Sequence, residues 1–180
     1  NKNFNIIKIT NNTNNKKNLE FNNKYLISPE FSKFHKFSPR LRVAVLASGE
    51  GSNFLNLINL SFEKKIDIEI KILISNNEKA GCIKKAKDSN IPILLLNDKN
   101  FSNKETFEEE IINTLNNNNI ELVVLAGWMK IISEKFVNAF KNKIINIHPS
   151  ILPSFKGRNA IKDAMNHGVC FTGCSVHFVE

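Results

Sequence analysis

The sequence feature that most constrains the fold is a repeated alternation of short apolar runs with segments of helical periodicity. Residues 122–126 read LVVLA, an apolar run without polar alternation, which is typical of a strand covered on both faces of a parallel sheet. The same scheme opens at residues 41–48, where LRVAVLAS precedes a glycine turn and then apolar residues at helical spacing. This alternation predicts an α/β fold with a doubly wound, mostly parallel sheet whose ligands bind beyond the carboxyl ends of the strands.

The remaining elements follow from the same two periodicities. We expect strands at residues 66–75, 91–96, 144–147 and 174–179, and helices at residues 81–90, 106–117 and 159–166. Ser133 is predicted to cap a further helix that runs to Phe140. The length of 180 residues and the 42% hydrophobic content indicate one domain, and no apolar run approaches the roughly 20 residues that span a bilayer.

Residues 1–40 are predicted to form a disordered tail on a domain that occupies residues 41–180. Ten of these 40 residues are Asn, and the segment is basic, poor in acids and without sustained periodicity. Its Ser and Phe residues around 28–38 resemble the later part of an organelle transit peptide, which places the protein in a plastid or mitochondrion. The alternative is a low-complexity leader on a cytoplasmic protein.

The net charge of +8 is concentrated in this tail. The first 40 residues carry eight Lys or Arg and two acids, whereas the rest of the chain carries 17 basic and 15 acidic residues. A basic arm that binds nucleic acid is the alternative interpretation, but the tail lacks dense Arg clusters. We therefore expect neither nucleic acid nor a membrane as a partner, and the sequence does not determine an oligomeric state.

The sequence contains an odd number of cysteines, Cys82, Cys170 and Cys174, and their spacing does not match a paired metal-ligand motif. A disulfide framework is therefore not expected, and no metal site is predicted. We interpret all three as small buried hydrophobic residues.

A glycine-rich turn follows the first predicted strand and reads SGEGSN at residues 48–53. Free N–H groups at the start of the next helix, together with its positive dipole end, form an anion site, so Gly51, Ser52 and Asn53 are candidates for phosphate binding. The turn is neither a Walker loop nor a complete GxGxxG motif, and a simple tight turn is the alternative.

A second candidate segment is the loop GWMKII at residues 127–132. A large aromatic residue, a flexible thioether and two aliphatic residues after a buried strand are suited to line a slot for a flat heterocycle. Packing of these side chains into the core is the alternative.

The third candidate is the pair Asn146 and His148, in the stretch NIHPSILPSFKG. Their i, i+2 spacing places both side chains on one side of a strand, and Pro149 favours extended geometry at His148. A histidine can transfer a proton near neutrality, and an amide can hold a carbonyl or stabilise an oxyanion. A structural role for the histidine is the alternative.

These blocks, together with GCSVHFV near residue 177, resemble the phosphoribosylglycinamide formyltransferase family in order and approximate spacing. The resemblance begins near Leu41, runs to the last residue and implies a Rossmann-like formyltransferase fold. It implies transfer of a formyl group from 10-formyltetrahydrofolate to the amine of glycinamide ribonucleotide, in purine synthesis. No metal is implied.

The resemblance also assigns roles to individual residues. Those with an implied role are the catalytic Asn146, His148 and His177, the phosphate-binding Gly51, Ser52 and Asn53, and the folate-binding Lys104, Met129, Lys130, Ile131, Ile132 and Asn146. The family further has an aspartate a few residues past the SVHFV strand, beyond Glu180, so we expect this sequence to be a fragment. Lys104 and Lys130 stand where relatives often have Arg, which affects folate affinity more than the type of reaction.

Other proteins on the formyl-folate scaffold remain alternatives. Methionyl-tRNA formyltransferase has a different first turn and needs a basic folded surface, and formyltetrahydrofolate hydrolase lacks the phosphate turn. A non-catalytic folate- or nucleotide-binding remnant is a further alternative. A nicotinamide dehydrogenase fits poorly, because Ser75 and Asn76 stand where an acidic residue is needed.

Overall fold

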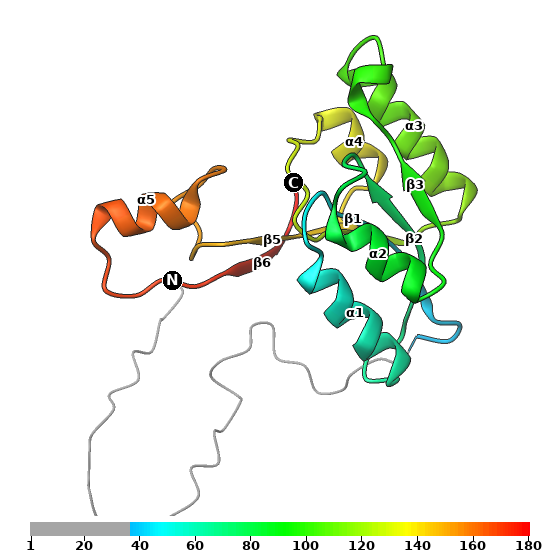
Figure 1. Cartoon of the computed structure of the whole chain (residues 1–180), viewed down its shortest axis with the longest axis horizontal. Coiled ribbons are helices and arrows are strands. Elements are labelled where there is room, and N and C mark those ends of the chain that lie inside the picture. The colour runs from blue at the N-terminus through cyan, green and yellow to red at the C-terminus, as the bar shows by residue number, and fades with distance from the viewer. Residues whose placement is uncertain (1–36) are drawn as a thin grey trace, which may run out of the picture. The chain divides into compact units, whose positions relative to one another are not determined.

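The computed structural model describes residues 37–180, whose central feature is a six-stranded sheet flanked by helices (Figure 1). The transit-peptide and nucleic-acid interpretations of the tail fall almost entirely on residues outside this range. Among the helices of residues 37–180, none combines the length and apolar character needed to cross a membrane. The same residues contain no cluster of three or more His, Cys, Asp or Glu side chains that could hold a metal ion.

The sheet has the strand order β3-β2-β1-β4-β5-β6. The first five of these strands are parallel, and β6 runs antiparallel to β5. Their bounds are β1 (Leu41–Leu46), β2 (Ile68–Ser75), β3 (Ile93–Leu95), β4 (Leu122–Leu125), β5 (Ile144–His148) and β6 (Ser175–Phe178). This order confirms the predicted doubly wound, mostly parallel sheet, with its switch point between β1 and β4.

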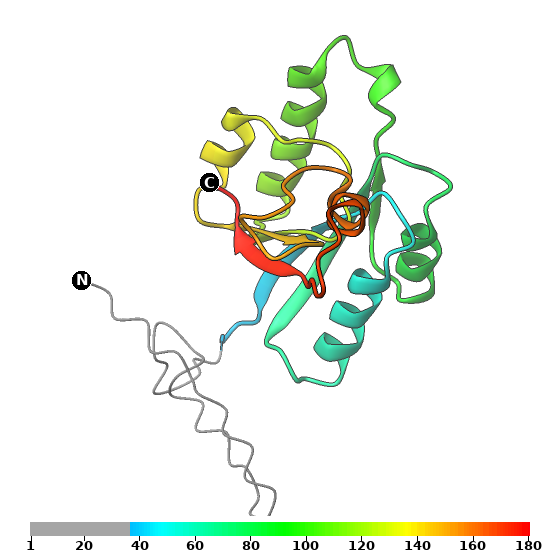
Figure 2. The same cartoon turned by 90° about the vertical axis from the view of Figure 1, so that its left-hand side faces the viewer.

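The helices cover both faces of the sheet, as Figure 2 shows with α1 and α2 on one side and α3 and α4 on the other. They are α1 (Ser52–Phe62), α2 (Gly81–Asp88), α3 (Lys104–Asn117), α4 (Glu134–Ala139) and α5 (Ala160–His167). A short 3-10 helix, η2 (Asp98–Asn100), was not expected from the apolar pattern. Ser133 caps α4 as predicted, because its side chain accepts a hydrogen bond from the N–H of Phe136.

The two faces of β1 belong to different hydrophobic clusters. Val43 and Val45 pack with Phe54 of α1, while Ala44 and Leu46 join the cluster that contains Phe136 of α4. Each of these side chains is fully buried. A central strand buried on both faces explains why its sequence is apolar without alternation.

The three predicted site segments leave neighbouring strands at the same edge of the sheet. β1, β4 and β5 are adjacent and parallel, so their carboxyl ends lie together. The backbone N–H of Ser48 donates to the carbonyl of Gly127 at 3.2 Å, which joins the loops after β1 and β4. Leu125 is paired with Asn146, which brings the third segment beside the second.

The cysteine prediction holds for only one residue. Cys82 is buried in α2, but Cys170 and Cys174 are exposed, so the prediction was wrong for both of them. They lie in the irregular segment between α5 and β6, which is not packed on the sheet.

Candidate active site

The turn after β1 is shaped by Gly51, which is the N-cap of α1 and has a φ of 75°. A Cβ atom at this position would lie 2.6 Å from the Cβ of Cys82, so both the backbone angle and the packing against α2 require glycine. Because Gly51 has no side chain, the first N–H groups of α1 receive no side-chain cap. Ser52 and Asn53 are exposed there, as an anion site at a helix N-terminus requires.

The turn is held from the side by α2. The N–H of Cys82 donates to the carbonyl of Gly49 at 3.2 Å. Lys85 donates to the backbone carbonyl of Glu50 at 2.7 Å and to its carboxylate at 2.5 Å. The hydrogen bond and the charge of Lys85 lower the pKa of Glu50 below its ordinary value of 4.5. Lys85 therefore neutralises a carboxylate that lies within the predicted phosphate turn.

The loop after β4 divides between the core and the pockets. Trp128 is half-buried and stacks on Phe107 with ring centroids 6.4 Å apart, and Ile132 packs against the same cluster. Met129 and Ile131 are instead exposed, by 57% and 83%. The core-packing interpretation therefore holds for Trp128 and Ile132, while the heterocycle slot stays a prediction for the exposed residues of the segment.

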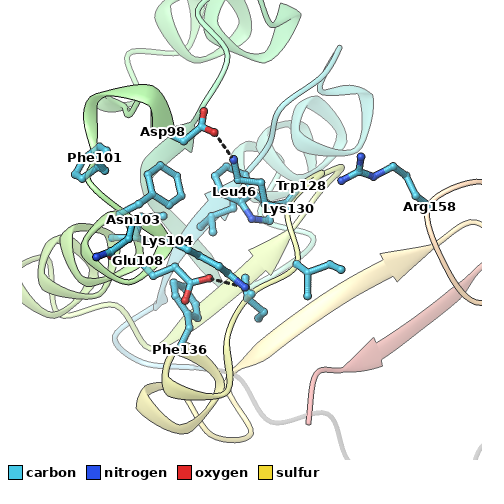
Figure 3. Close-up of a pocket in the computed structure, with 14 residues that line it drawn as sticks. Leu46, Asp98, Phe101, Asn103, Lys104, Glu108, Trp128, Lys130, Phe136 and Arg158 are labelled. Carbon is cyan, nitrogen blue, oxygen red and sulfur yellow. Dashed lines mark hydrogen bonds and ion pairs between the residues drawn. The ribbon is translucent and has the colours of Figure 1, made fainter.

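Lys130 of this loop and Lys104 of α3 already have acidic partners (Figure 3). Lys130 pairs with Asp98 at 2.6 Å, and its hydrogen bond lowers the pKa of Asp98. Lys104 lies 3.7 Å from the buried carboxylate of Glu108, which also accepts hydrogen bonds from Ser133. The side chain of Lys130 also lies over the Phe107 ring, with Nζ 5.5 Å from the ring centroid.

Asn146 is oriented by His177, its partner across the β5–β6 ladder. The ring Nδ1 of His177 donates to the carbonyl of Phe178 at 2.9 Å, so in the neutral ring Nε2 is the acceptor. The Asn146 amide nitrogen lies 3.2 Å from this Nε2 and donates to it. One amide hydrogen and the carbonyl oxygen of Asn146 remain for a ligand.

His148 ends β5 and is held by the loop that follows. Its Nε2 donates to the carbonyl of Phe155 at 3.0 Å. The fully buried Ser150 donates to the carbonyl of Ser154 at 2.6 Å, and Ser175 of β6 donates to the carbonyl of Ser150 at 2.8 Å. The loop is therefore fixed by side-chain hydrogen bonds from two strands, and the second ring nitrogen of His148 is left for chemistry.

Three pockets meet around the loop after β4. One, of about 450 Å³, is lined by Asn53, Met129, Asn146 and His148 among others. A second, of about 730 Å³, is lined by Asn146 and His177 together with Val137 of α4 among others. A third, of about 440 Å³, has Lys104 in its wall (Figure 3). Asn146 is common to the first two pockets and lies in the wall between them.

The structure brings most of the predicted site residues together, but not into one cavity. The 450 Å³ pocket contains Asn53, Met129, Lys130, Ile131, Asn146 and His148. Gly51 and Ser52 belong to the turn beside it, Lys104 and Ile132 line the 440 Å³ pocket, and His177 lines the 730 Å³ pocket.

Sequence reasoning missed two features of the site. One is the Glu50–Lys85 pair, and the other is Arg158, which lines two of the three pockets. Arg158 directly follows the FKG of the Pro-rich stretch, and that position was the only available signal.

The fold and the site together define a Rossmann-like α/β protein with pockets beyond the carboxyl ends of its central strands. The family model described as formyl transferase matches residues 41–180. The chain therefore belongs to the formyl transferase family.

Similar proteins agree with this assignment. The chain is 35% identical to a phosphoribosylglycinamide formyltransferase of Bacillus halodurans whose crystal structure is known, with a TM-score of 0.75 over 77% of this chain and 72% of that one. A glycinamide ribonucleotide transformylase 1 from Geobacillus kaustophilus is also 35% identical, with a TM-score of 0.77 over 78% of this chain and 75% of that one.

Among curated sequences, the human trifunctional purine biosynthetic protein adenosine-3 is 44% identical over 140 residues. Those residues are 78% of this chain and 14% of the human protein. The chain thus spans about a seventh of the length of this relative.

Proposed function

We propose that the protein transfers a formyl group from 10-formyltetrahydrofolate to the amine of glycinamide ribonucleotide, a step of purine synthesis. The observation that carries this proposal is the position of Asn146 between two pockets, one reaching the turn after β1 and the other reaching His177. An amine and an electrophile bound in these pockets meet at the Asn146 amide, beside His148. The names of the solved relatives support the same reaction.

The ribonucleotide is held by its phosphate at the turn of Gly51, Ser52 and Asn53. The uncapped N–H groups at the start of α1 carry partial positive charge that faces this position. Lys85 keeps the carboxylate of Glu50 from repelling the phosphate. Asn53 lines the pocket that contains His148, so a phosphate held there leaves the rest of the molecule near the catalytic pair.

The folate is held along Met129, Lys130, Ile131 and Ile132, with Lys104 and Asn146 in the walls of the pockets that this segment lines. The residues present fit such a ligand, because the aromatic and aliphatic side chains of these pockets suit a flat ring. When bound, the donor supplies an electrophilic formyl carbon.

Asn146 and His148 handle the charge that develops in the reaction. Negative charge grows on the formyl oxygen as the amine attacks, and a charged imidazole with a fixed amide donor stabilises it. The carbonyl re-forms as the bond from the formyl carbon to the folate nitrogen breaks, and the proton lost by the amine passes to that nitrogen. Nε2 of His148 is hydrogen-bonded to the carbonyl of Phe155, so Nδ1 supplies the donor to the formyl oxygen in the imidazolium form. His177 supports this arrangement by holding the Asn146 amide.

The acceptor of the formyl group tests the proposal. The purified protein is incubated with 10-formyltetrahydrofolate and, in separate reactions, with glycinamide ribonucleotide, with methionyl-tRNA, or with water alone. We expect the formylated ribonucleotide to be the main product. Formate without ribonucleotide dependence would instead identify a hydrolase, formyl-methionyl-tRNA would identify the tRNA enzyme, and folate binding without turnover would identify a binding remnant.

A further inference from the structure

Arg158 lies in the loop between β5 and α5 and reaches across to the loop after β4 (Figure 3). Its Nη2 donates to the backbone carbonyl of Met129 at 3.1 Å. Arg158 lines both the 440 Å³ pocket and the 450 Å³ pocket. This cation therefore stands where the two pockets meet, and none of the site roles described above uses it.

The charges around the 440 Å³ pocket distinguish Arg158 from its two neighbouring cations. Lys130 is paired with Asp98, and Lys104 lies beside Glu108. Within residues 37–180, Arg158 has no carboxylate within ion-pair distance. The charge of Arg158 is consequently available to a ligand, while the lysines are largely neutralised.

The chemistry of the side chain indicates what it binds. A guanidinium has five N–H donors in a planar fork, and the bond to Met129 uses one of its terminal nitrogens. The remaining edge matches a carboxylate or a phosphate, which accept two parallel hydrogen bonds from such a fork. The shared chemistry is an oxyanion of a substrate.

We propose that Arg158 binds a glutamate carboxylate of the formyl-folate, an inference that rests on the proposed function. A carboxylate of the folate is favoured over the ribonucleotide phosphate because Arg158 shares the 440 Å³ pocket with Lys130, Ile131 and Ile132 of the proposed folate-binding segment. Of the three residues of the phosphate turn, Asn53 lines a pocket together with Arg158, whereas Gly51 and Ser52 do not. Arg158 thus anchors the anionic end of the donor while the Met129 carbonyl holds the guanidinium in place.

The test compares folic acid with its diamide, in which both glutamate carboxylates are uncharged amides. Arg158→Gln keeps an amide donor for the Met129 carbonyl but removes the charge. We expect Arg158→Gln to weaken the binding of folic acid about tenfold, the factor that corresponds to about 1.4 kcal/mol. The binding of the diamide and of glycinamide ribonucleotide should stay within about twofold of the wild type.

Lys162→Gln is the matched control, because Lys162 is an exposed cation of α5 that lines none of these pockets. An equal loss for folic acid and its diamide would show that Arg158 only positions the loop. A loss confined to the ribonucleotide would assign Arg158 to the phosphate. Both results overturn the proposal, and so does unchanged binding of folic acid by Arg158→Gln. If the wild-type protein binds no folic acid, the proposed formyl donor itself is overturned.

Discussion

The turn after β1 and the loop after β5 both border the pocket of His148, yet they are held in different ways. The turn depends on backbone geometry, through the positive φ of Gly51 and its contact with Cys82. The loop depends on side-chain hydrogen bonds, in which Ser175 joins Ser150 across 25 positions of the sequence. The first region is therefore specified by backbone conformation and close packing, and the second by side-chain hydrogen bonds. Substitutions in the two regions should consequently destabilise the protein for different reasons.

The largest stability effect is expected from Gly51→Ala. The alanine would have an unfavourable φ, which costs about 1–2 kcal/mol, and its Cβ would overlap Cys82, which costs about 1–3 kcal/mol more. We expect the free energy of unfolding to fall by about 3 kcal/mol in urea denaturation. Affinity for glycinamide ribonucleotide should fall as well.

Two other glycines separate these causes. Gly127 has a φ of 82° but open space around it, and Gly49 has open space and no positive φ. Gly127→Ala should cost about 1 kcal/mol and Gly49→Ala less than about 0.5 kcal/mol. If Gly51→Ala costs no more than Gly127→Ala, the contact with Cys82 does not constrain the turn.

Ser175→Ala in β6, which removes hydrogen bonds to the loop after β5, should have a smaller effect on stability. The substitution leaves the N–H of Leu152 and the carbonyl of Ser150 without their partner. Such losses cost about 1–3 kcal/mol. Because this loop holds His148, we also expect a lower kcat with little change in the KM for the ribonucleotide. Ser154→Ala is the control, since this exposed side chain makes no hydrogen bond within residues 37–180, and equal stability of the two variants would contradict the prediction.

Substitutions in the Glu50–Lys85 pair are expected to have the smallest effect, and it should fall on ribonucleotide affinity. Lys85→Met leaves the Glu50 carboxylate uncompensated beside the phosphate, so ribonucleotide affinity should fall about three- to tenfold. Glu50→Gln in the same chain should restore it. If the double variant binds no better than Lys85→Met, repulsion by Glu50 is not the cause.

The pH dependence of stability gives an independent measure of this pair. Lys85 lowers the pKa of Glu50 in the folded protein, so the stabilisation is present above the ordinary value of 4.5 and is lost as the pH falls through the lower folded pKa. Denaturation between about pH 6 and about pH 3 should therefore show a smaller acid loss in Glu50→Gln than in the wild type.

Much of the fold was predictable because the sheet is buried on both faces. Apolar runs such as the one that forms β4 are forced by their position between α-helical layers, so they can be recognised without knowing their neighbours. The glycine turn and the Asn146–His148 spacing are local features in the same sense. The family relationship confirms the predicted class of protein.

The remaining details depend on contacts between residues far apart in the sequence. Nothing local predicts that Lys130 pairs with Asp98, or that Glu108 is buried against Ser133. The short η2 helix that contains Asp98 has no apolar periodicity from which it could be predicted. For the same reason, two hydrogen bonds could be found only from the structure. One joins His148 to the Phe155 carbonyl, and the other joins Arg158 to the Met129 carbonyl.

The central claim, that His148 acts on the formyl group, is tested most directly by single-turnover formyl transfer in His148→Ala. The same preparations are titrated with folic acid, and His167→Ala is the control, because this exposed histidine contacts Phe155 of the same loop. We predict that His148→Ala slows transfer about 100-fold or more while folic acid binding stays within about twofold. Unchanged transfer in His148→Ala would contradict the account.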